Sequence, residues 1–487
     1  MKFFTFYCNC KNSAFIRFIF LLTTVLFFSS CHKNEIVVDE PLLTKYNSIA
    51  NPIAIVNASE DIDCYVDYSW GMGEGMKATA QFNAKLKDFL GGRKVSYYKV
   101  GASEIPPTID INSAEANFLD PNNFKEPGSK LKIAIDKITS NKSKVSIFIT
   151  DFERVEDVSL KQNLVGAPNP HPIEASAWAQ NNFKDWLKEG NQIDIFAKQY
   201  QKPDFWFDNN HQKLYPNWIY TLVFTPNAVI KDENLFKTSV LKFLNDEYTN
   251  LNGGDSKHFT YTSNNFKIEQ EKKDEAIGDA NDNVVVQENI TNTKENGFEF
   301  YYFKCSDMMS LNADETQKDK RVINKIKITS QVPCFSDIEY GLKVFDITQS
   351  LTNFSLSQNQ EAPEVTSDAE TGKKDTIANK PIIYNYEKGS PAENVFDFVY
   401  NVETNEIGIK LKPDFTGVTQ NTIYQVDVII KSAKLKDFSE ENNVLKLGYA
   451  MNYSINSLSE SVKRALADVS TSIENKVIYT IYIKIDK

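Results

Sequence analysis

Side chains that carry oxygen ligands recur in this sequence where apolar segments end. Asp67 and Ser69 follow the apolar run 62–66, Ser129 precedes a stretch with helical spacing, and Asp151 follows the apolar run 144–150. Carboxylate and hydroxyl oxygens are the ligands that Mg²⁺ prefers. If both runs are strands of one α/β sheet, their carboxyl ends meet at one edge, where a ligand binds. The four side chains are therefore candidate ligands of a divalent cation.

The segments around these residues alternate between two periodic patterns. Apolar residues recur at helical spacing in some segments, and other segments are short and almost wholly apolar, as in buried strands. The predicted strands cover residues 62–68, 95–100, 144–150, 193–197 and 218–224. The predicted helices cover residues 79–90, 130–138, 177–187 and 235–244. This alternation predicts that residues 51–250 form a doubly wound α/β domain with a mostly parallel sheet.

The motifs at the strand ends resemble those of a known family. The order is strand, Asp-x-Ser-x-x-Met, helix, then Gly-Ser-x-Leu opening a helix, then apolar strand and Thr-Asp. It resembles the von Willebrand factor A fold and its metal-ion-dependent adhesion site. The resemblance implies that Asp67 and Ser69 match the first two ligands, Ser129 the threonine and Asp151 the last aspartate. It also implies that bound Mg²⁺ accepts a carboxylate from a partner protein.

Two positions depart from the family pattern. Gly71 stands where the family has a second serine, and Phe152 replaces the glycine that usually follows the final aspartate. A water molecule can take the place of the missing serine, because Mg²⁺ keeps several waters. An alternative interpretation needs no metal: Asp and Ser after a strand also form turns and cap helices by accepting backbone N–H groups.

The N-terminus has the pattern of a secretory signal. Basic residues precede the apolar run 18–28, which is shorter than a membrane-spanning helix and ends in Ser-Ser-Cys31. This resembles a bacterial lipoprotein signal with a relaxed lipobox, and an ordinary signal peptide or anchor is the alternative. We expect residues 1–30 to be removed, Cys31 to be acylated and residues 31–50 to be a flexible tether. A short Lys/acidic cluster there resembles the surface-export signal of Bacteroides–Flavobacterium lipoproteins, which favours the outer membrane, while retention at the inner leaflet stays open.

Short alternating runs typical of antiparallel strands replace the helical pattern beyond residue 255. We expect a β-rich, sandwich-like domain at 251–354, a disordered linker at 355–380 and a second β-rich domain with one helix at 381–487. Cys305 and Cys334 are expected to pair in an oxidising compartment.

Composition excludes several classes of function. The net charge is −11 without a basic stripe, which excludes nucleic acid as the main partner. Six cysteines and four histidines are too few for a disulfide scaffold or a dedicated zinc or haem site. The chain has none of the common catalytic motifs, so we expect no enzyme. A metal-dependent hydrolase using Asp67 and Asp151 is the catalytic alternative, although no histidine accompanies them as a base.

The predicted function is therefore that of an envelope lipoprotein anchored to the membrane by lipid. It would bind a protein partner, as an adhesion module, through a Mg²⁺-dependent site. The alternative is a structural lipoprotein of a secretion or surface-assembly complex, whose A-like domain binds without a metal.

Overall fold

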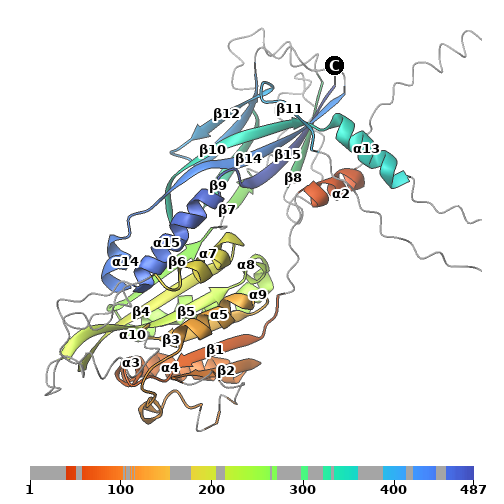
Figure 1. Ribbon diagram of the computed structural model, residues 1–487. Helices are drawn as coiled ribbons and strands as arrows, with labels where there is room; N and C mark the ends of the chain where they lie inside the picture. Colours follow the sequence, from red (N-terminus) through yellow and green to blue (C-terminus); the bar gives the residue numbers. More distant parts are fainter. Residues whose placement is uncertain are drawn as a thin grey trace, which may run out of the picture.

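A computed structural model describes residues 40–50, 58–102, 105, 110, 112–113, 116–153, 177–203, 214–263, 266–270, 298–304, 322–330, 334–359, 388–412, 421–445 and 457–486. The predicted signal peptide, Cys31 and Cys305 lie outside these residues. Figure 1 shows an α/β unit at one end of the molecule and a β-rich unit at the other. Mixed α/β content with two additional, mainly antiparallel sheets agrees with the expected combination of an α/β part and a β-rich part; only β8 and β15 pair in parallel in these two sheets among the described residues.

The α/β unit is built on a six-stranded sheet in the order β2-β1-β3-β5-β4-β6. Its strands are β1 (Ile62–Asp67), β2 (Val95–Val100), β3 (Val145–Thr150), β4 (Gln192–Pro203), β5 (Leu214–Thr225) and β6 (Ser256–Thr262). Strand β1 pairs in parallel with β2 and β3, whereas β5 is antiparallel to both of its neighbours. The prediction of a mostly parallel sheet was wrong for β4 to β6. Only residues 204–213 join β4 to β5, and so short a connection favours an antiparallel pair, because a parallel crossover needs a longer one.

Helices cover both faces of this sheet, as expected for a doubly wound arrangement. Helices α3 (Met72–Ala78), α4 (Ala80–Gly91) and α10 (Val240–Asn252) share one apolar core with the sheet. Helices α5 (Leu131–Ser140), α7 (Gln180–Lys188) and α15 (Ser457–Ser472) share the other. The predicted helix 235–244 is two helices, α9 (Glu233–Thr238) and α10, because the Ser239 hydroxyl accepts the Lys242 N–H and caps α10. The short helix α8 (Asn227–Lys231) precedes them.

The β-rich unit consists of two further sheets. One has the order β11-β10-β14-β15-β8, with β8 (Phe298–Lys304), β10 (Phe335–Asp346), β11 (Ser390–Pro391), β14 (Thr422–Leu435) and β15 (Val477–Asp486). The other has the order β12-β13-β9-β7, with β7 (Phe266–Gln270), β9 (Val322–Ser330), β12 (Phe396–Asn401) and β13 (Glu406–Leu411). Aromatic rings join the sheets, with centroids 5.2 Å apart for Tyr340 and Tyr400 and 5.6 Å apart for Phe396 and Tyr424. Both sheets combine strands from 251–354 with strands from 381–487, so the two expected domains share one sandwich.

The helix α2 (Glu40–Ala50) corrects the expected extent of the tether. Leu43 and Tyr46 of α2 are buried with α13 (Thr348–Asn359) against the five-stranded sheet. The Tyr482 hydroxyl donates to Asn47 Oδ1 at 2.9 Å. Burial of these side chains explains why residues 40–50 are helical and docked on the sandwich. Helix α13 likewise includes residues 355–359 of the expected linker, and the rest of that linker lies outside the described residues.

The C-terminal part of the chain returns to the α/β unit. The Ser461 hydroxyl of α15 accepts the Ala179 N–H at 3.3 Å. The Tyr220 hydroxyl donates at 2.9 Å to the carbonyl of Val444, the last residue of α14 (Ser439–Val444). One apolar core continues from the α/β sheet through α15 into the sandwich. The α/β unit is therefore completed by β6 and α15, both outside residues 51–250.

Cys334 is a free, buried thiol in this structure, in contrast to its expected pairing with Cys305. Its Sγ lies 3.3 Å from both the Thr262 nitrogen and the Thr262 carbonyl oxygen. Cys64 is also free and buried within β1, as expected for a small apolar residue.

Candidate functional site

Asp67 is the central residue of the predicted site. It is the last residue of β1, which lies between β2 and β3, and its side chain is wholly buried. Asp67 Oδ1 accepts the Ser69 N–H at 2.9 Å. This bond, from the backbone two residues on, closes an Asx turn and directs the chain into the loop before α3.

Two hydroxyls from distant segments donate to the Asp67 carboxylate. The Ser129 hydroxyl donates to Oδ1, and the Thr150 hydroxyl donates to Oδ2 at 2.9 Å. Ser129 lies just before α5, and Thr150 is the last residue of β3. The structure thus joins Asp67 to residues that are 62 and 83 positions away in the sequence.

The topology of the sheet explains why these groups meet. From β1 the chain continues to β2 on one side, and from β2 it crosses over to β3 on the other side of β1. The carboxyl ends of β1 and β3 therefore flank a topological switch point, where open α/β sheets bind their ligands.

Ser129 does not act as the helix cap that the alternative interpretation assigned to it. Lys130 is the N-cap residue of α5, and no side chain caps this helix by a hydrogen bond. The Ser129 hydroxyl is directed to Asp67 instead, and Ser129 is wholly buried. Ser69 is 9% exposed, so its side chain lies closer to solvent than those of Asp67 and Ser129.

Asp151 follows Thr150 and is also wholly buried. Its Oδ1 accepts the Glu153 N–H at 3.1 Å, while the Phe152 N–H donates to the Thr150 hydroxyl at 2.9 Å. Phe152 has a φ of 59°, in the left-handed region that favours glycine. Stacking of its ring on Trp178, with centroids 4.8 Å apart, helps to hold this turn.

The loop that contains Glu126 is held to the loop that follows β1 by backbone hydrogen bonds. The Trp70 N–H donates to the Glu126 carbonyl at 3.1 Å, and the Glu126 N–H donates to the Tyr68 carbonyl at 3.0 Å. Glu126 also forms an ion pair with Lys99 at 3.4 Å. Its side chain crosses Gly101 so closely that a Cβ there would lie 2.7 Å from the Glu126 Cγ. Glycine at 101 therefore lets this loop bring Ser129 to the site.

Burial raises the pKa of the Asp67 carboxyl above its ordinary value, and hydrogen bonds from Ser129, Ser69 and Thr150 oppose this rise. The bonds that Asp67 accepts come from neutral donors, and no Lys, Arg or His in the described ranges pairs with it. The site thus holds a buried carboxylate without a protein counter-charge in that part of the chain.

Thr150 and Glu126 are site residues that the sequence analysis did not identify as such. In the sequence, Thr150 stood out only as the residue before Asp151. Its position at the end of a predicted strand could have identified it as a site residue. Nothing in the sequence pattern indicated Glu126. In the part of the chain that the structure describes, no three His, Cys, Asp or Glu side chains gather as a metal centre.

No known protein family, curated protein or solved structure matches this chain. Every helix within the described ranges is too short or too polar to cross a bilayer.

Proposed function

We propose that this chain is a lipoprotein of the cell envelope that binds a partner protein through a divalent cation at the carboxyl ends of β1 and β3. The proposal takes the α/β unit as similar to a von Willebrand A domain with an altered adhesion site. It rests on the burial of Asp67 among neutral donors.

A buried carboxylate without a counter-charge is unfavourable, and either a proton or a cation relieves this cost. Asp67, Ser69, Ser129 and Asp151 would hold Mg²⁺, whose positive charge provides a binding point for a carboxylate of the partner. These four residues present hard oxygen atoms, which fit this cation. Because the Ser129 hydroxyl donates its hydrogen to Asp67, its lone pairs face away from the carboxylate and are oriented for a ligand.

The turn after β3 also supports the resemblance. Phe152 occupies the position of the family's glycine and has the positive φ that a glycine would readily adopt. The replacement of glycine by Phe152 therefore leaves a glycine-like backbone next to Asp151.

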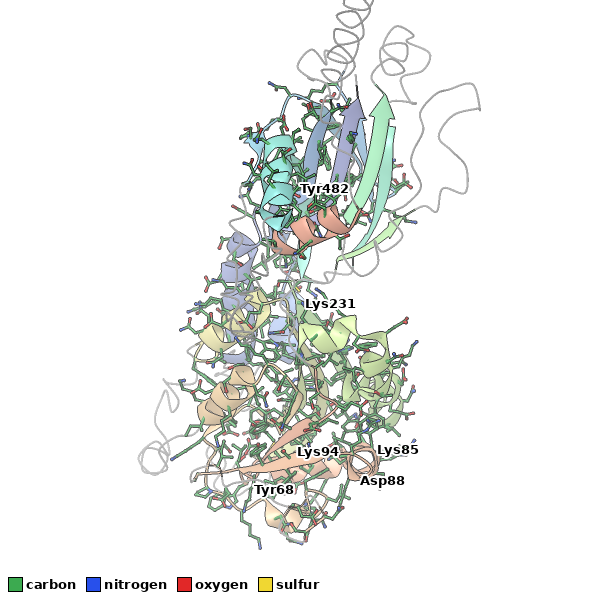
Figure 2. The ribbon with its side chains drawn as sticks, turned by 90° about the vertical axis from the view of Figure 1, so that its right-hand side faces the viewer. Tyr68, Lys85, Asp88, Lys94, Lys231 and Tyr482 are labelled. Atoms are coloured by element: carbon green, nitrogen blue, oxygen red, sulfur yellow. The ribbon has the colours of Figure 1, made fainter. Side chains whose placement is uncertain are left out.

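The position of α2 fits an anchored binding protein. Tyr482, beneath α2, lies within the upper unit in Figure 2, and Tyr68, just after β1, lies near the bottom of the lower unit. The segment from Cys31 to Glu40 spans at most about 30 Å. An acyl group on Cys31 would therefore hold the sandwich close to the membrane and present the Asp67 site away from it.

A metal-free structural lipoprotein of a secretion or surface-assembly complex is the second candidate. One observation favours it: Asp67 already accepts hydrogen bonds on both oxygens. We favour binding over catalysis, because His258 pairs with Asp194 at 2.9 Å and no histidine of the described ranges contacts Asp67.

Titration calorimetry of the full chain with Mg²⁺ and with Mn²⁺ tests the proposal. We expect saturable heat for the wild type and for Asp88→Asn, which alters an exposed carboxylate of α4, and none for Asp67→Asn. A pull-down with and without chelator then tests whether the partner depends on the cation. The absence of heat from the wild type would remove the cation mechanism and leave the metal-free candidate.

A further inference from the structure

The sandwich contains a groove of about 590 Å³ between β10 and the hairpin of β12 and β13, at the other end of the molecule from β1 in Figure 1. Its volume lies in the range of small-molecule sites. Phe335, Tyr340, Phe398 and Tyr400 line it with aromatic surface.

The aromatic walls are held in place by contacts with each other and with the hairpin. The rings of Tyr340 and Tyr400 meet edge to face at 71°. The Tyr400 hydroxyl donates to Asn405 Oδ1 at 2.8 Å, and Asn405 also lines the groove. Burial raises the pKa of both tyrosines, so their hydroxyls stay protonated at neutral pH. The walls are therefore preformed and carry hydroxyls that donate and accept hydrogen bonds.

Two successive irregularities in the pairing of β10 with β14 lie at this groove. Ser336 pairs with Lys434, Glu339 with Ser432 and Tyr340 with Ile430, so Lys431 is an extra residue opposite β10. Such bulges redirect side chains and are frequent next to binding sites. Asp337, Glu339 and Lys431 from this region all line the groove.

Glycine at 341 makes room for the lysine. A Cβ at Gly341 would lie 2.3 Å from Lys431 Cε, so the aliphatic stem of Lys431 crosses the strand at that point. The stem thus packs against the backbone of β10, and Lys431 is one of the residues that line the groove.

The charges of the groove balance each other. Asp337, Glu339 and Lys431 line the groove, and the ammonium group of Lys434 lies 4.0 Å from the carboxylate of Asp337 at its border. An anion would meet the two carboxylates and a cation would meet the lysines, so neither has a net attraction. A neutral ligand with apolar faces and many hydroxyls satisfies both the aromatic walls and the mixed donors and acceptors.

We propose that this groove binds a neutral saccharide, with sugar rings against Tyr340 and Tyr400 and hydroxyls bonded to Glu339, Asn405 and Lys431. The proposal is independent of a cation at Asp67.

A glycan array tests this with the labelled full chain in chelator, using neutral and charged oligosaccharides from plant cell walls, animal mucins and bacterial surfaces. We expect binding to a set of neutral glycans. Tyr400→Ala, Glu339→Gln and Lys431→Met should each weaken it about tenfold or more. Glu403→Gln, in the exposed turn of the same hairpin, should bind like the wild type.

Glu339 and Lys431 are exposed, so their variants keep the fold and separate lost contacts from unfolding. No neutral glycan bound by the wild type, or equal binding by Glu339→Gln and Lys431→Met, would overturn the proposal. Binding of charged glycans alone would also overturn it.

Discussion

Replacing Asp67 by asparagine removes the buried charge while keeping most of its hydrogen bonds. The asparagine Oδ1 can still accept from the Ser69 N–H and the Ser129 hydroxyl. The new Nδ2 must donate to the Thr150 hydroxyl oxygen, which already accepts the Phe152 N–H. Each of the three charge-assisted bonds, worth about 1.5–3 kcal/mol, thus becomes a neutral one of about 0.5–1.5 kcal/mol. Relief of the buried charge offsets this loss, so the cation-free stabilities should agree within about 1 kcal/mol.

The raised pKa of Asp67 determines in which direction the stability of the folded protein changes with pH. Burial raises the folded-state pKa of Asp67, so the folded protein holds this proton to a higher pH than the unfolded chain. The stability that Asp67 contributes is fully present below the ordinary pKa of about 4 and is lost as pH rises through the raised value. Urea midpoints in chelator should therefore fall with pH more steeply for the wild type than for Asp67→Asn.

A bound cation should offset the cost of burying the charged Asp67 carboxylate. At one hundred times its dissociation constant, a ligand stabilises the native state by about 2.7 kcal/mol. For a unit the size of the α/β part this corresponds to a rise in melting temperature of about 5–10 °C. The rise should occur in the wild type and in Asp88→Asn, and be absent in Asp67→Asn and Asp151→Asn. A rise that persists in both site variants would place the ion elsewhere, and equal pH dependence of wild type and Asp67→Asn would refute the argument from burial.

Three further predictions concern the anchor, the junction and a buried lysine. Cys31→Ser should abolish labelling by a fatty-acid analogue and leave an uncleaved precursor; unchanged labelling would discard the lipoprotein proposal. Tyr220→Phe leaves the Val444 carbonyl without this donor, so the free energy of unfolding in urea should fall by about 1–3 kcal/mol. No fall would mean that water replaces the hydroxyl. Burial and the charge of Lys231 lower the pKa of Lys476 to about 8. Stability should therefore rise as pH increases from about 8 toward the ordinary lysine pKa, and Lys476→Met should flatten this rise in urea midpoints; an unchanged slope would assign it to other groups.

Most individual strands and helices could be predicted from local pattern. The stripe of Phe82, Leu86 and Leu90 predicted α4, and the apolar run of β3 predicted a buried strand, because both patterns need only short-range periodicity. Helix α3 was not predicted, and it contains Gly73 and Gly75. Its buried methionines, packed beside the sheet, outweigh the poor helix propensity of glycine.

The candidate site could be predicted in part. Parallel pairing of β1 with β3 places the ends of both strands at one edge, and this rule brought Asp67 and Asp151 into one prediction. The roles of Thr150 and Glu126 could not be predicted, because each depends on the register of a neighbouring segment. Hydrogen bonds such as that from Thr150 to Asp67 have no signature in either local sequence.

The sequence by itself determined where strands and helices form, which faces are apolar, and which oxygen-bearing residues stand at strand ends. Tertiary structure decided how the segments pair. It made β4 and β5 an antiparallel hairpin, combined strands from 251–354 and 381–487 in both sheets of the sandwich, and returned α15 to the α/β unit. It also decided the groove, which depends on a pairing irregularity between β10 and β14. Local pattern reflects the conformational preference of each segment, whereas pairing is set by apolar area buried between segments far apart in the chain, which no single segment encodes.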